Sequence, residues 1–294
     1  MNTALGIRKA CVAGQFYEAN PKLLRDEIRK LAAEAKIAHA PNAAPLRAAI
    51  LPHAGYIFSA ASAIKTLLSA PIPEYSRALV IAPSHRVPFR GLALCSQGAY
   101  ETPLGQIALD TEGARQILNA KSPFAQFLDL AHENEHALEV ELPLLQELCP
   151  PKILLPLICG HLDVSSAHAV AELLLPFWEP QTLWIISSDF THFGNSFGYL
   201  PFQSDIRENL NRLDLGAAEL IANIKLEDFD AYLERTGATI CGANPIMILL
   251  AVLENVRKTG EKIKGKVAAY SNSGELNGEW SHCVSYAGIA FSSE

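Results

Sequence analysis

The chain lacks the features of several common protein classes. None of its apolar stretches reaches the ~18 residues that a membrane-spanning helix requires. Lysine and arginine form no run or stripe, and the formal net charge is −7, so we expect no nucleic-acid partner. The first residues contain a short apolar run but no core of a signal peptide. We therefore expect a protein that associates with neither membranes nor nucleic acids.

Cysteine is sparse, and its distribution is uninformative about pairing. The six cysteines lie at positions 11, 95, 149, 159, 241 and 283, and no two form a Cys-x-x-Cys motif. In a chain of 294 residues this usage favours reduced thiols and a cytoplasmic location over a disulfide framework. Neither Gly-x-Gly-x-x-Gly nor a complete Walker loop occurs, so dinucleotide-binding and P-loop functions lose support.

What the chain does contain is apolar residues, 49% of the total, arranged in alternating patterns. Short runs rich in Ile, Leu and Val recur at 47–52, 78–82, 153–158 and 182–187. Helical patterns alternate with them at 21–37, 57–69, 111–119, 135–148, 165–177, 203–222 and 243–257, and two further strands, near 264–271 and 284–291, follow. Strands that are apolar on both sides and alternate with helices predict an α/β/α sandwich with a mostly parallel central sheet. One domain over residues 1–294 is the simplest interpretation; a second domain would need a boundary, and none is visible.

Polar side chains follow three of these predicted strands at the point where each strand ends. His53 follows the first, His85 the second, and the pair Asp189 and His192 the fourth. Ligands of open α/β sheets bind at the carboxyl ends of parallel strands, so we expect these four side chains to share one edge of the sheet. Imidazole is the commonest metal ligand and a general base near neutral pH, and a carboxylate three residues away can orient it.

Each of these residues also has a simpler interpretation. Either of the first two histidines could be a loop residue bonded to a main-chain carbonyl, and Asp189 could cap the next helical turn. Cys241 precedes the predicted helix 243–257, where a helix N-terminus would stabilise a reactive thiolate. A free cysteine is more often a small buried apolar residue. The residues alone leave both interpretations of Cys241 open.

The segment HENEH, residues 132–136, has the form of the zinc-protease motif His-Glu-x-x-His. We do not expect a protease, because both histidines would have to lie within one helix, whereas the segment is acidic and Asn134 resembles a helix start. The helix that follows would point His136 and Glu139 along one side, next to the main site. Tyr56 supplies another polar group near that site.

Eight segments occur in the order in which one known family has them. They are AGQFYEANPKLL, LPHAGYIFSA, APSHR, YETPLG, HALEVELPLLQ, SSDFTHFG, CGANPI and YSNSG. Together they resemble the Memo family, called in prokaryotes the AmmeMemoRadiSam system protein B, from about residue 7 to about residue 291. One departure is Glu18, where the family often has proline after the Phe-Tyr pair, and it lies outside the predicted site.

The resemblance carries expectations about fold and metal. The Memo family is similar in fold to the class III extradiol dioxygenases, which hold non-haem Fe(II) with two histidines and a carboxylate. It implies a pocket at one sheet edge whose metal ligands would be His53, His85 and Cys241. A thiolate with two imidazoles suits iron, copper or zinc; we favour Fe(II) or Cu and keep Zn as an alternative.

The remaining predicted site residues surround that metal. The resemblance places Asp189 and His192 in a second pair at the pocket and matches His136 to a pocket-facing histidine. We expect these three to be the catalytic residues, with His192 as acid and base and Asp189 orienting it or the substrate. Tyr56 and Glu139 are predicted to contact the substrate.

Three functions follow as hypotheses. The first is a metal-dependent redox enzyme with a dioxygenase-like pocket and an unknown small-molecule substrate. The second is a non-catalytic adaptor module that binds a metal or a peptide, and the third is a zinc-dependent hydrolase. The prokaryotic family name also implies a pathway shared with a radical-SAM protein and an AMMECR1-like protein.

Overall fold

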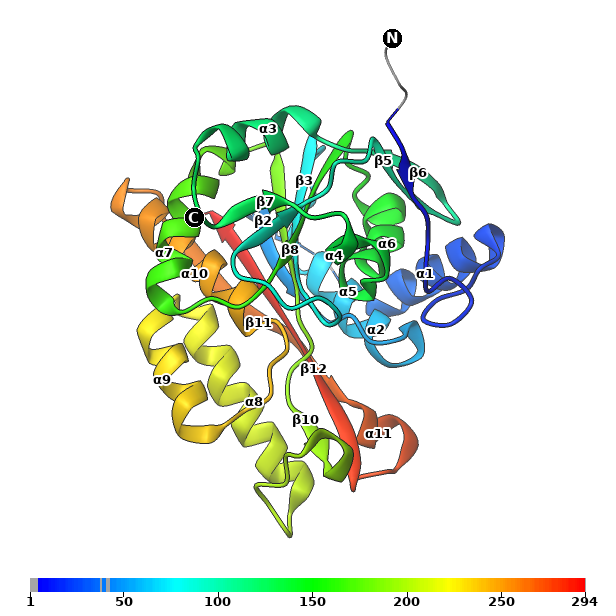
Figure 1. The fold of residues 1–294 in the computed structure, drawn as a ribbon. Coiled ribbons are helices and arrows are strands. Elements are labelled where there is room, and N and C mark those ends of the chain that lie inside the picture. Colours follow the sequence, from blue (N-terminus) through cyan, green and yellow to red (C-terminus); the bar gives the residue numbers. More distant parts are fainter. Residues whose placement is uncertain (1–4, 38, 41–42, 294) are drawn as a thin grey trace.

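In the computed structural model a large sheet of nine strands forms the centre of the molecule (Figure 1). The structure describes residues 5–37, 39–40 and 43–293. The strands of this sheet are β2 (Leu46–Leu51), β3 (Arg77–Pro83), β4 (Leu92–Leu94), β7 (Ala125–Phe127), β8 (Ile153–Cys159), β9 (Thr182–Ser187), β10 (His192–Gly194), β11 (Ile263–Asn272) and β12 (His282–Ser293). Their order is β10-β12-β2-β9-β3-β8-β4-β7, and β11 pairs with β12 outside this path.

Four neighbouring strands, β2, β9, β3 and β8, run parallel and form the middle of the sheet. Each is buried along almost its whole length, which explains why each reads as an uninterrupted apolar run. Strand β12 joins β2 antiparallel, and β4 joins β8 antiparallel. The predicted α/β/α sandwich with a mostly parallel central sheet is therefore confirmed, with antiparallel strands on either side of its parallel middle.

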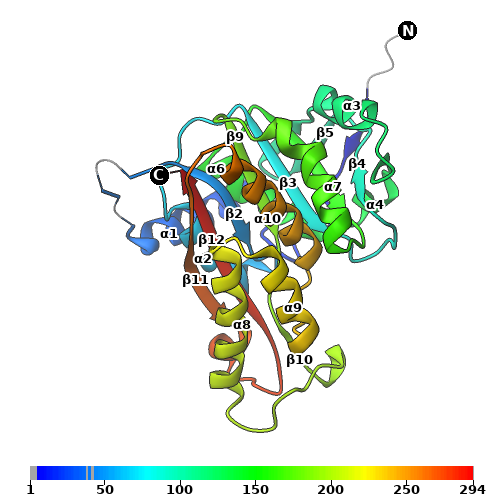
Figure 2. The ribbon, with the colours of Figure 1, turned by 90° about the vertical axis from the view of Figure 1, so that its left-hand side faces the viewer.

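Helices cover both faces of this sheet (Figure 2). They are α1 (Pro21–Ala35), α2 (Tyr56–Leu67), α3 (Thr111–Asn119), α4 (Leu130–Glu133), α5 (His136–Glu139), α6 (Glu141–Leu148), α7 (Val164–Leu174), α8 (Ile206–Ala222), α9 (Leu226–Thr236), α10 (Ala243–Lys258) and α11 (Ser273–Asn277). Alternate residues of β3 reach the two layers: Val80 packs with the α1, α2 and α6 layer, whereas Leu79 and Ile81 pack with α7 to α10. Among the described residues, no helix combines the length and apolarity needed to cross a bilayer.

The predicted helix 135–148 is divided into α5 and α6. Pro143 has no N–H to donate to the carbonyl four residues earlier, Glu139, so a helical hydrogen bond is missing at this point. The start also differs from the expectation, because Asn134 ends α4 and Glu135 caps α5 by accepting a hydrogen bond from the Ala137 N–H. His136 is therefore the first residue of a short separate helix, α5.

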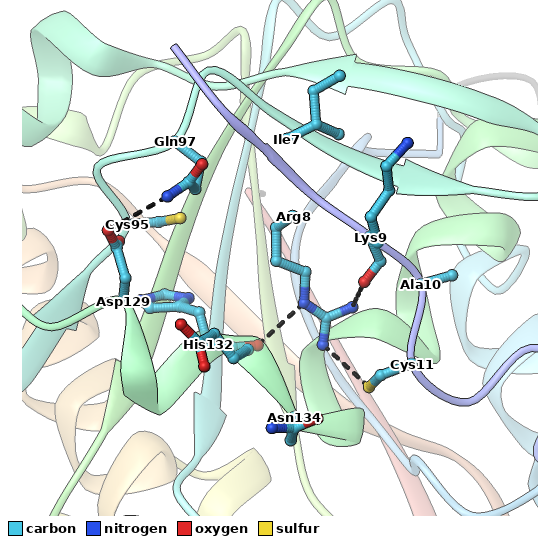
Figure 3. A pocket seen from close by; sticks show the side chains of 11 residues that line it. Ile7, Arg8, Lys9, Ala10, Cys11, Cys95, Gln97, Asp129, His132 and Asn134 are labelled. Atoms are coloured by element: carbon cyan, nitrogen blue, oxygen red, sulfur yellow. Dashed lines mark hydrogen bonds between the residues drawn. The ribbon is translucent and has the colours of Figure 1, made fainter.

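A second, three-stranded sheet was not predicted. It consists of β1 (Ile7–Arg8), β5 (Ala99–Thr102) and β6 (Gly105–Ala108), with β1 parallel to β5. These strands are too short to show a hydrophobic period. Between β1 and α4 lies a cavity of about 370 Å³, in which the Arg8 side chain is directed toward α4 and α5 (Figure 3).

Candidate metal centre

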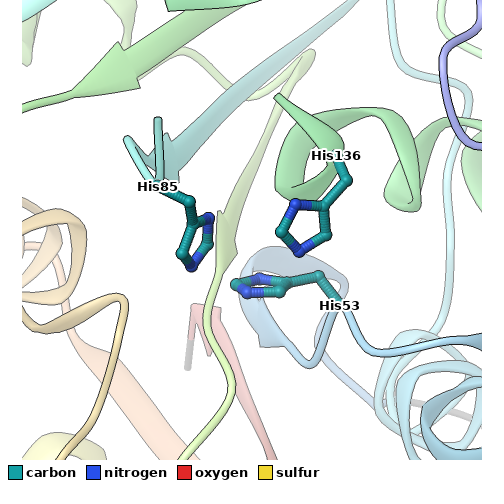
Figure 4. A group of neighbouring side chains, drawn as sticks. All are labelled: His53, His85 and His136. Atoms are coloured by element: carbon teal, nitrogen blue, oxygen red, sulfur yellow. The ribbon is translucent and has the colours of Figure 1, made fainter. Parts of the chain in front are cut away.

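Three imidazole rings converge where β2 and β3 end and α5 begins. His53 comes after β2, His85 after β3, and His136 is the first residue of α5. Their rings face one another (Figure 4), and each offers a nitrogen within 4.8 Å of the other two. The ring centroids of His85 and His136 are 4.8 Å apart, and that of His53 lies 5.3 and 5.4 Å from them. The strand-end argument thus brought two of these residues together correctly, and the third comes from a helix.

One carboxylate, that of Glu135, holds two of the rings. Its Oε1 lies 2.9 Å from His85 Nδ1 and 3.2 Å from His136 Nδ1, while Oε2 accepts the His85 main-chain N–H at 2.7 Å. Burial raises the pKa of this carboxyl, but the hydrogen bonds from His136 and His85 outweigh it and lower the pKa below its ordinary value. An ionised Glu135 accepts N–H groups from both Nδ1 atoms, which leaves both Nε2 lone pairs free for a metal.

His53 is held in the same way by a hydroxyl group. Its Nδ1 lies 2.7 Å from Ser187 Oγ, and that hydroxyl lies 2.7 Å from the Ala137 carbonyl. The single hydrogen of this hydroxyl can go to the Ala137 carbonyl or to Glu141 Oε1, which lies 2.9 Å away. In either case the hydroxyl oxygen accepts from His53 Nδ1–H, and Nε2 again carries the lone pair. Burial, followed by the neighbouring His85 and His136, lowers the pKa of His53 well below its usual value. The ring is therefore neutral, the form that binds metal.

Cys241 approaches the same centre from the other side of the sheet edge. Its Sγ lies 3.3 Å from His53 Nε2 and accepts the Asp189 main-chain N–H at 3.3 Å. Gly242 makes this approach possible, since a Cβ there would lie 2.3 Å from the Cβ of Ser188. Burial and the Asp189 carboxylate raise the pKa of the thiol, so the helix N-terminus of α10 does not produce a thiolate by itself. A bound cation would favour the thiolate.

Asp189 and His192 border the cluster. Asp189 Oδ1 accepts the His53 N–H at 2.8 Å, and its Oδ2 lies 4.0 Å from His53 Nε2. Burial raises the pKa of Asp189, against the attraction of His192 and the hydrogen bond from His53. The Nδ1 of His192 lies 3.0 Å from the Thr239 carbonyl and its main-chain N–H bonds Thr239 Oγ1 at 2.8 Å, which leaves its Nε2 available. This side of the centre thus presents a buried carboxyl and an imidazole with an unbonded Nε2.

Two predicted substrate contacts are located elsewhere. The Tyr56 hydroxyl donates to the Val140 carbonyl at 2.9 Å, and the side chain is buried. Glu139 is fully buried, and both of its oxygens are occupied by the N-terminal segment. The helical period predicted Glu139 beside His136, and both lie on α5, but the N-terminal segment covers the Glu139 carboxylate. Neither side chain faces a surface that a substrate could reach.

The structure also shows the surroundings of two other histidines, His132 and His168. In HENEH, His132 is buried with Nδ1 2.7 Å from the Tyr100 hydroxyl and Nε2 3.0 Å from the Ala93 carbonyl. Both ring nitrogens of His132 are therefore hydrogen-bonded, and neither is free to bind zinc as the protease motif would require. The sequence suggested no partner for His168. In the structure it lies near the surface with Glu227 and Glu254, and the possible ligand atoms of the three are within 4.8 Å of one another.

The sequence reasoning missed three residues with a recognisable signal. Glu135 is next to His136 and Ser187 is two residues before Asp189. Polar groups close to predicted ligands often hold those ligands in place at a metal site. The third, Ser196, sits in GNSFG, which has the form Gly-x-Ser-x-Gly. Its hydroxyl lies 2.7 Å from His282 Nδ1, but the serine is exposed on a 3₁₀ turn after β10, without the strand-to-helix elbow that makes such a serine a nucleophile.

Comparison with known proteins places nearly the whole chain in one family. The family described as "Memo-like protein" matches residues 8–290. "Protein memo-1 homolog" of Caenorhabditis elegans is 30% identical over 97% of this chain and 82% of its own length. "Protein MEMO1" of Homo sapiens is 26% identical over 98% of both chains, and a "MEMO1 family protein" of Pyrococcus furiosus is 29% identical over 96% of this chain and 98% of its own.

Among solved structures, an uncharacterized protein of Escherichia coli K12 superposes with a TM-score of 0.49 and 13% identity, over 83% of this chain and 99% of that chain. The family match spans nearly the whole chain, including every residue of the centre described above. The chain belongs to the Memo-like protein family.

Proposed function

We propose that this protein binds a transition metal ion through His53, His85 and Cys241 and uses it in redox chemistry on a small organic molecule. The observation that supports it best is the convergence of imidazoles whose Nδ1 atoms are all occupied by acceptors, with a thiol 3.3 Å from the Nε2 of one of them. Side chains oriented from behind in this way are typical of metal ligands.

The donor set fits the metals that we favour. Two neutral imidazoles and a sulfur are soft to intermediate ligands, which suit Fe(II) and Cu better than Mg²⁺ or Ca²⁺. His136 is close enough to act as a further ligand or as an acid–base group, since its ring centroid is 4.8 Å from that of His85. A bound iron or copper ion would supply a redox couple and a coordination position open to a small molecule.

The surrounding residues have separable tasks. His53 and Asp189 are buried and exclude water from one side of the centre, whereas the His85 side chain is 30% exposed and gives a route from solvent. Asp189, with its raised pKa, can hold a proton beside His53. His192 can take up or release a proton at its Nε2 atom, because Nδ1 is fixed by the Thr239 carbonyl.

Metal content is the first test. The protein would be purified anaerobically without a metal-binding tag, and Fe, Cu and Zn would be measured in the wild type, Cys241→Ser, His53→Ala and His168→Ala. We expect close to one equivalent of iron or copper, lost in the first two variants and kept in His168→Ala, which removes only the surface group. Metal that is retained in both Cys241→Ser and His53→Ala would refute the assignment of these ligands.

A zinc-dependent hydrolase is the second candidate, and one observation favours it. Three histidines with nitrogens within 4.8 Å of one another resemble the three-histidine set of catalytic zinc sites. This alternative predicts stoichiometric zinc, lost in His136→Ala as well as in His53→Ala, and no oxygen consumption. If no sample binds metal even after reconstitution, both enzyme proposals fail and a non-catalytic binding module becomes the better explanation.

A further inference from the structure

The N-terminal strap, defined here as residues 8–17, packs against α4, α5 and the start of α2. The Arg8 side chain is buried, with only 3% of its surface exposed. Nε donates to the His132 carbonyl at 2.9 Å, Nη2 donates to the Glu135 carbonyl at 2.6 Å, and Nη1 pairs with the Glu139 carboxylate. One guanidinium therefore binds α4, α5 and the cap between them. The planar fork of arginine can reach several acceptors at fixed angles, which lysine cannot do.

Glu139 binds the same strap from the helix side. Its Oε2 accepts the Cys11 N–H at 2.8 Å, and its Oε1 accepts the Val12 N–H at 3.0 Å and the Tyr17 hydroxyl at 2.6 Å. Burial raises the pKa of this carboxyl, but Arg8 and the hydrogen bonds outweigh it and lower the pKa. The carboxylate is thus ionised, fully buried and surrounded by donors from one segment of the chain.

The far end of the strap reaches both halves of the centre. The Phe16 ring lies 4.8 Å from the ring of His136. The Phe16 carbonyl accepts the Tyr56 N–H at 2.7 Å, at the start of α2, three residues after His53. A movement of the strap would therefore shift both His136 on α5 and the segment between His53 and the start of α2.

We infer that Arg8 and Glu139 are positioning residues for the metal centre, an inference that rests on the proposed function. They fix the main chain of Glu135 from one side, while its carboxylate holds His85 and His136 on the other. A buried ion pair is weak evidence for stability, because replacing both charges by apolar groups is often neutral, whereas removing one charge is costly. Fold stability and ligand positioning can therefore be separated by experiment.

The variants are Arg8→Met, Glu139→Leu and the double variant that carries both changes. Each single change leaves a buried charge without its partner and should lower the melting temperature, and the double variant should recover part of that loss. Metal affinity should behave differently. The double variant still lacks the donor to the Glu135 carbonyl, so its Kd for Zn(II), measured by competition with a chromophoric chelator, should stay ~10–100-fold weaker than that of the wild type.

Arg77→Met is the matched control. Arg77 pairs with Asp110 at 2.7 Å, both side chains are largely buried, and Arg77 opens β3 at the end opposite to His85. This variant should lose stability without any change in Kd for Zn(II). If the double variant binds Zn(II) as tightly as the wild type while its melting temperature changes, Arg8 and Glu139 stabilise the fold only, and the inference is wrong.

A measurement without metal separates this inference from the proposed function. In the metal-free wild type, nitrogen-15 NMR of the histidine side chains should show His85 and His136 protonated at Nδ1, as their contacts with Glu135 require. The double variant should show a mixture of tautomers at one or both rings. If the wild type binds no metal, the proposed function fails and the NMR result alone decides whether the strap positions the rings; unchanged tautomers would then overturn the inference. Arg8→Lys and Glu139→Gln serve as conservative versions if the larger changes prevent folding.

Discussion

Replacing Glu135 by glutamine tests how much of the metal centre depends on a residue that binds no metal itself. The carboxylate accepts four N–H groups: His85 Nδ1 at 2.9 Å, His85 N at 2.7 Å, Ala137 N at 3.1 Å and His136 Nδ1 at 3.2 Å. Glutamine keeps the shape but has one acceptor oxygen and one NH₂ group. If the oxygen stays next to the two rings, the NH₂ group faces the His85 main-chain N–H, so two donors oppose each other.

The magnitude follows from this geometry. Losing one charge-assisted hydrogen bond and leaving a buried donor without an acceptor costs about 1.5–3 kcal/mol of unfolding free energy. Weaker orientation of His85 and His136 should raise the Kd for Zn(II) by ~10–100-fold, which corresponds to ~1.4–2.7 kcal/mol. Both effects come from the same contact, so they should be similar in size.

The assay measures Zn(II) affinity by chelator competition and stability by urea unfolding at pH 7. Glu133→Gln is the control, because Glu133 lies two residues away, is exposed and should change neither quantity by more than ~0.5 kcal/mol. A Kd within twofold of the wild type for Glu135→Gln would show that the imidazoles keep their orientation without the carboxylate. Glu135 would then not be needed to orient His85 and His136 for metal binding.

Three further predictions follow from other contacts. Burial lowers the pKa of His132 to about 4, so the unfolded state takes up a proton that the folded state does not; this group alone should lower stability by about 3 kcal/mol between pH 6.5 and pH 4, and His132→Gln should remove that part of the slope in pH-dependent urea unfolding, leaving the part due to His53. Gly242→Ala would place a Cβ 2.3 Å from that of Ser188, so it should cost ~1–3 kcal/mol in thermal unfolding and weaken Zn(II) binding; an unchanged Kd would contradict the close approach as a requirement of the site. Burial raises the pKa of Glu141 well above its usual value, so at pH 7 this carboxyl favours the unfolded state, where it ionises freely; Glu141→Gln removes that cost and should therefore lower the unfolding free energy less than Glu135→Gln does, or raise it, and an equal loss in urea unfolding would contradict the raised pKa.

The parallel middle of the sheet and the strand-end residues could be predicted because each depends on a short stretch of chain. Strand β3 is a buried run bounded by polar residues, and His85 follows it directly, so a local pattern and one topological rule suffice. The rule says nothing about helix α5, which brings His136 to the same place. That residue came from a helical period and the family resemblance, and neither showed that the N-terminal segment covers the carboxylate of its neighbour Glu139.

The contacts that the sequence could not give are long-range pairings of polar groups. Arg8 and Glu139 are 131 residues apart, and Ser187 and His53 are 134 residues apart. No periodicity relates such positions, because their pairing depends on where two separate elements dock. Short strands such as β1 fail for a related reason, since two residues carry no hydrophobic period.

Three glutamates within seven residues show why residue type alone does not assign chemistry. Glu135, Glu139 and Glu141 are all almost completely buried on α5, its cap or the start of α6. Imidazole N–H groups lower the pKa of the first, a guanidinium lowers that of the second, and the third, whose bonded neighbour is the Ser187 hydroxyl, has a raised pKa. The same burial acts on all three, so the partner decides the charge. The first carboxylate holds the rings of His85 and His136, the second holds the N-terminal strap, and the third lies 2.9 Å from the Ser187 hydroxyl that contacts His53 Nδ1.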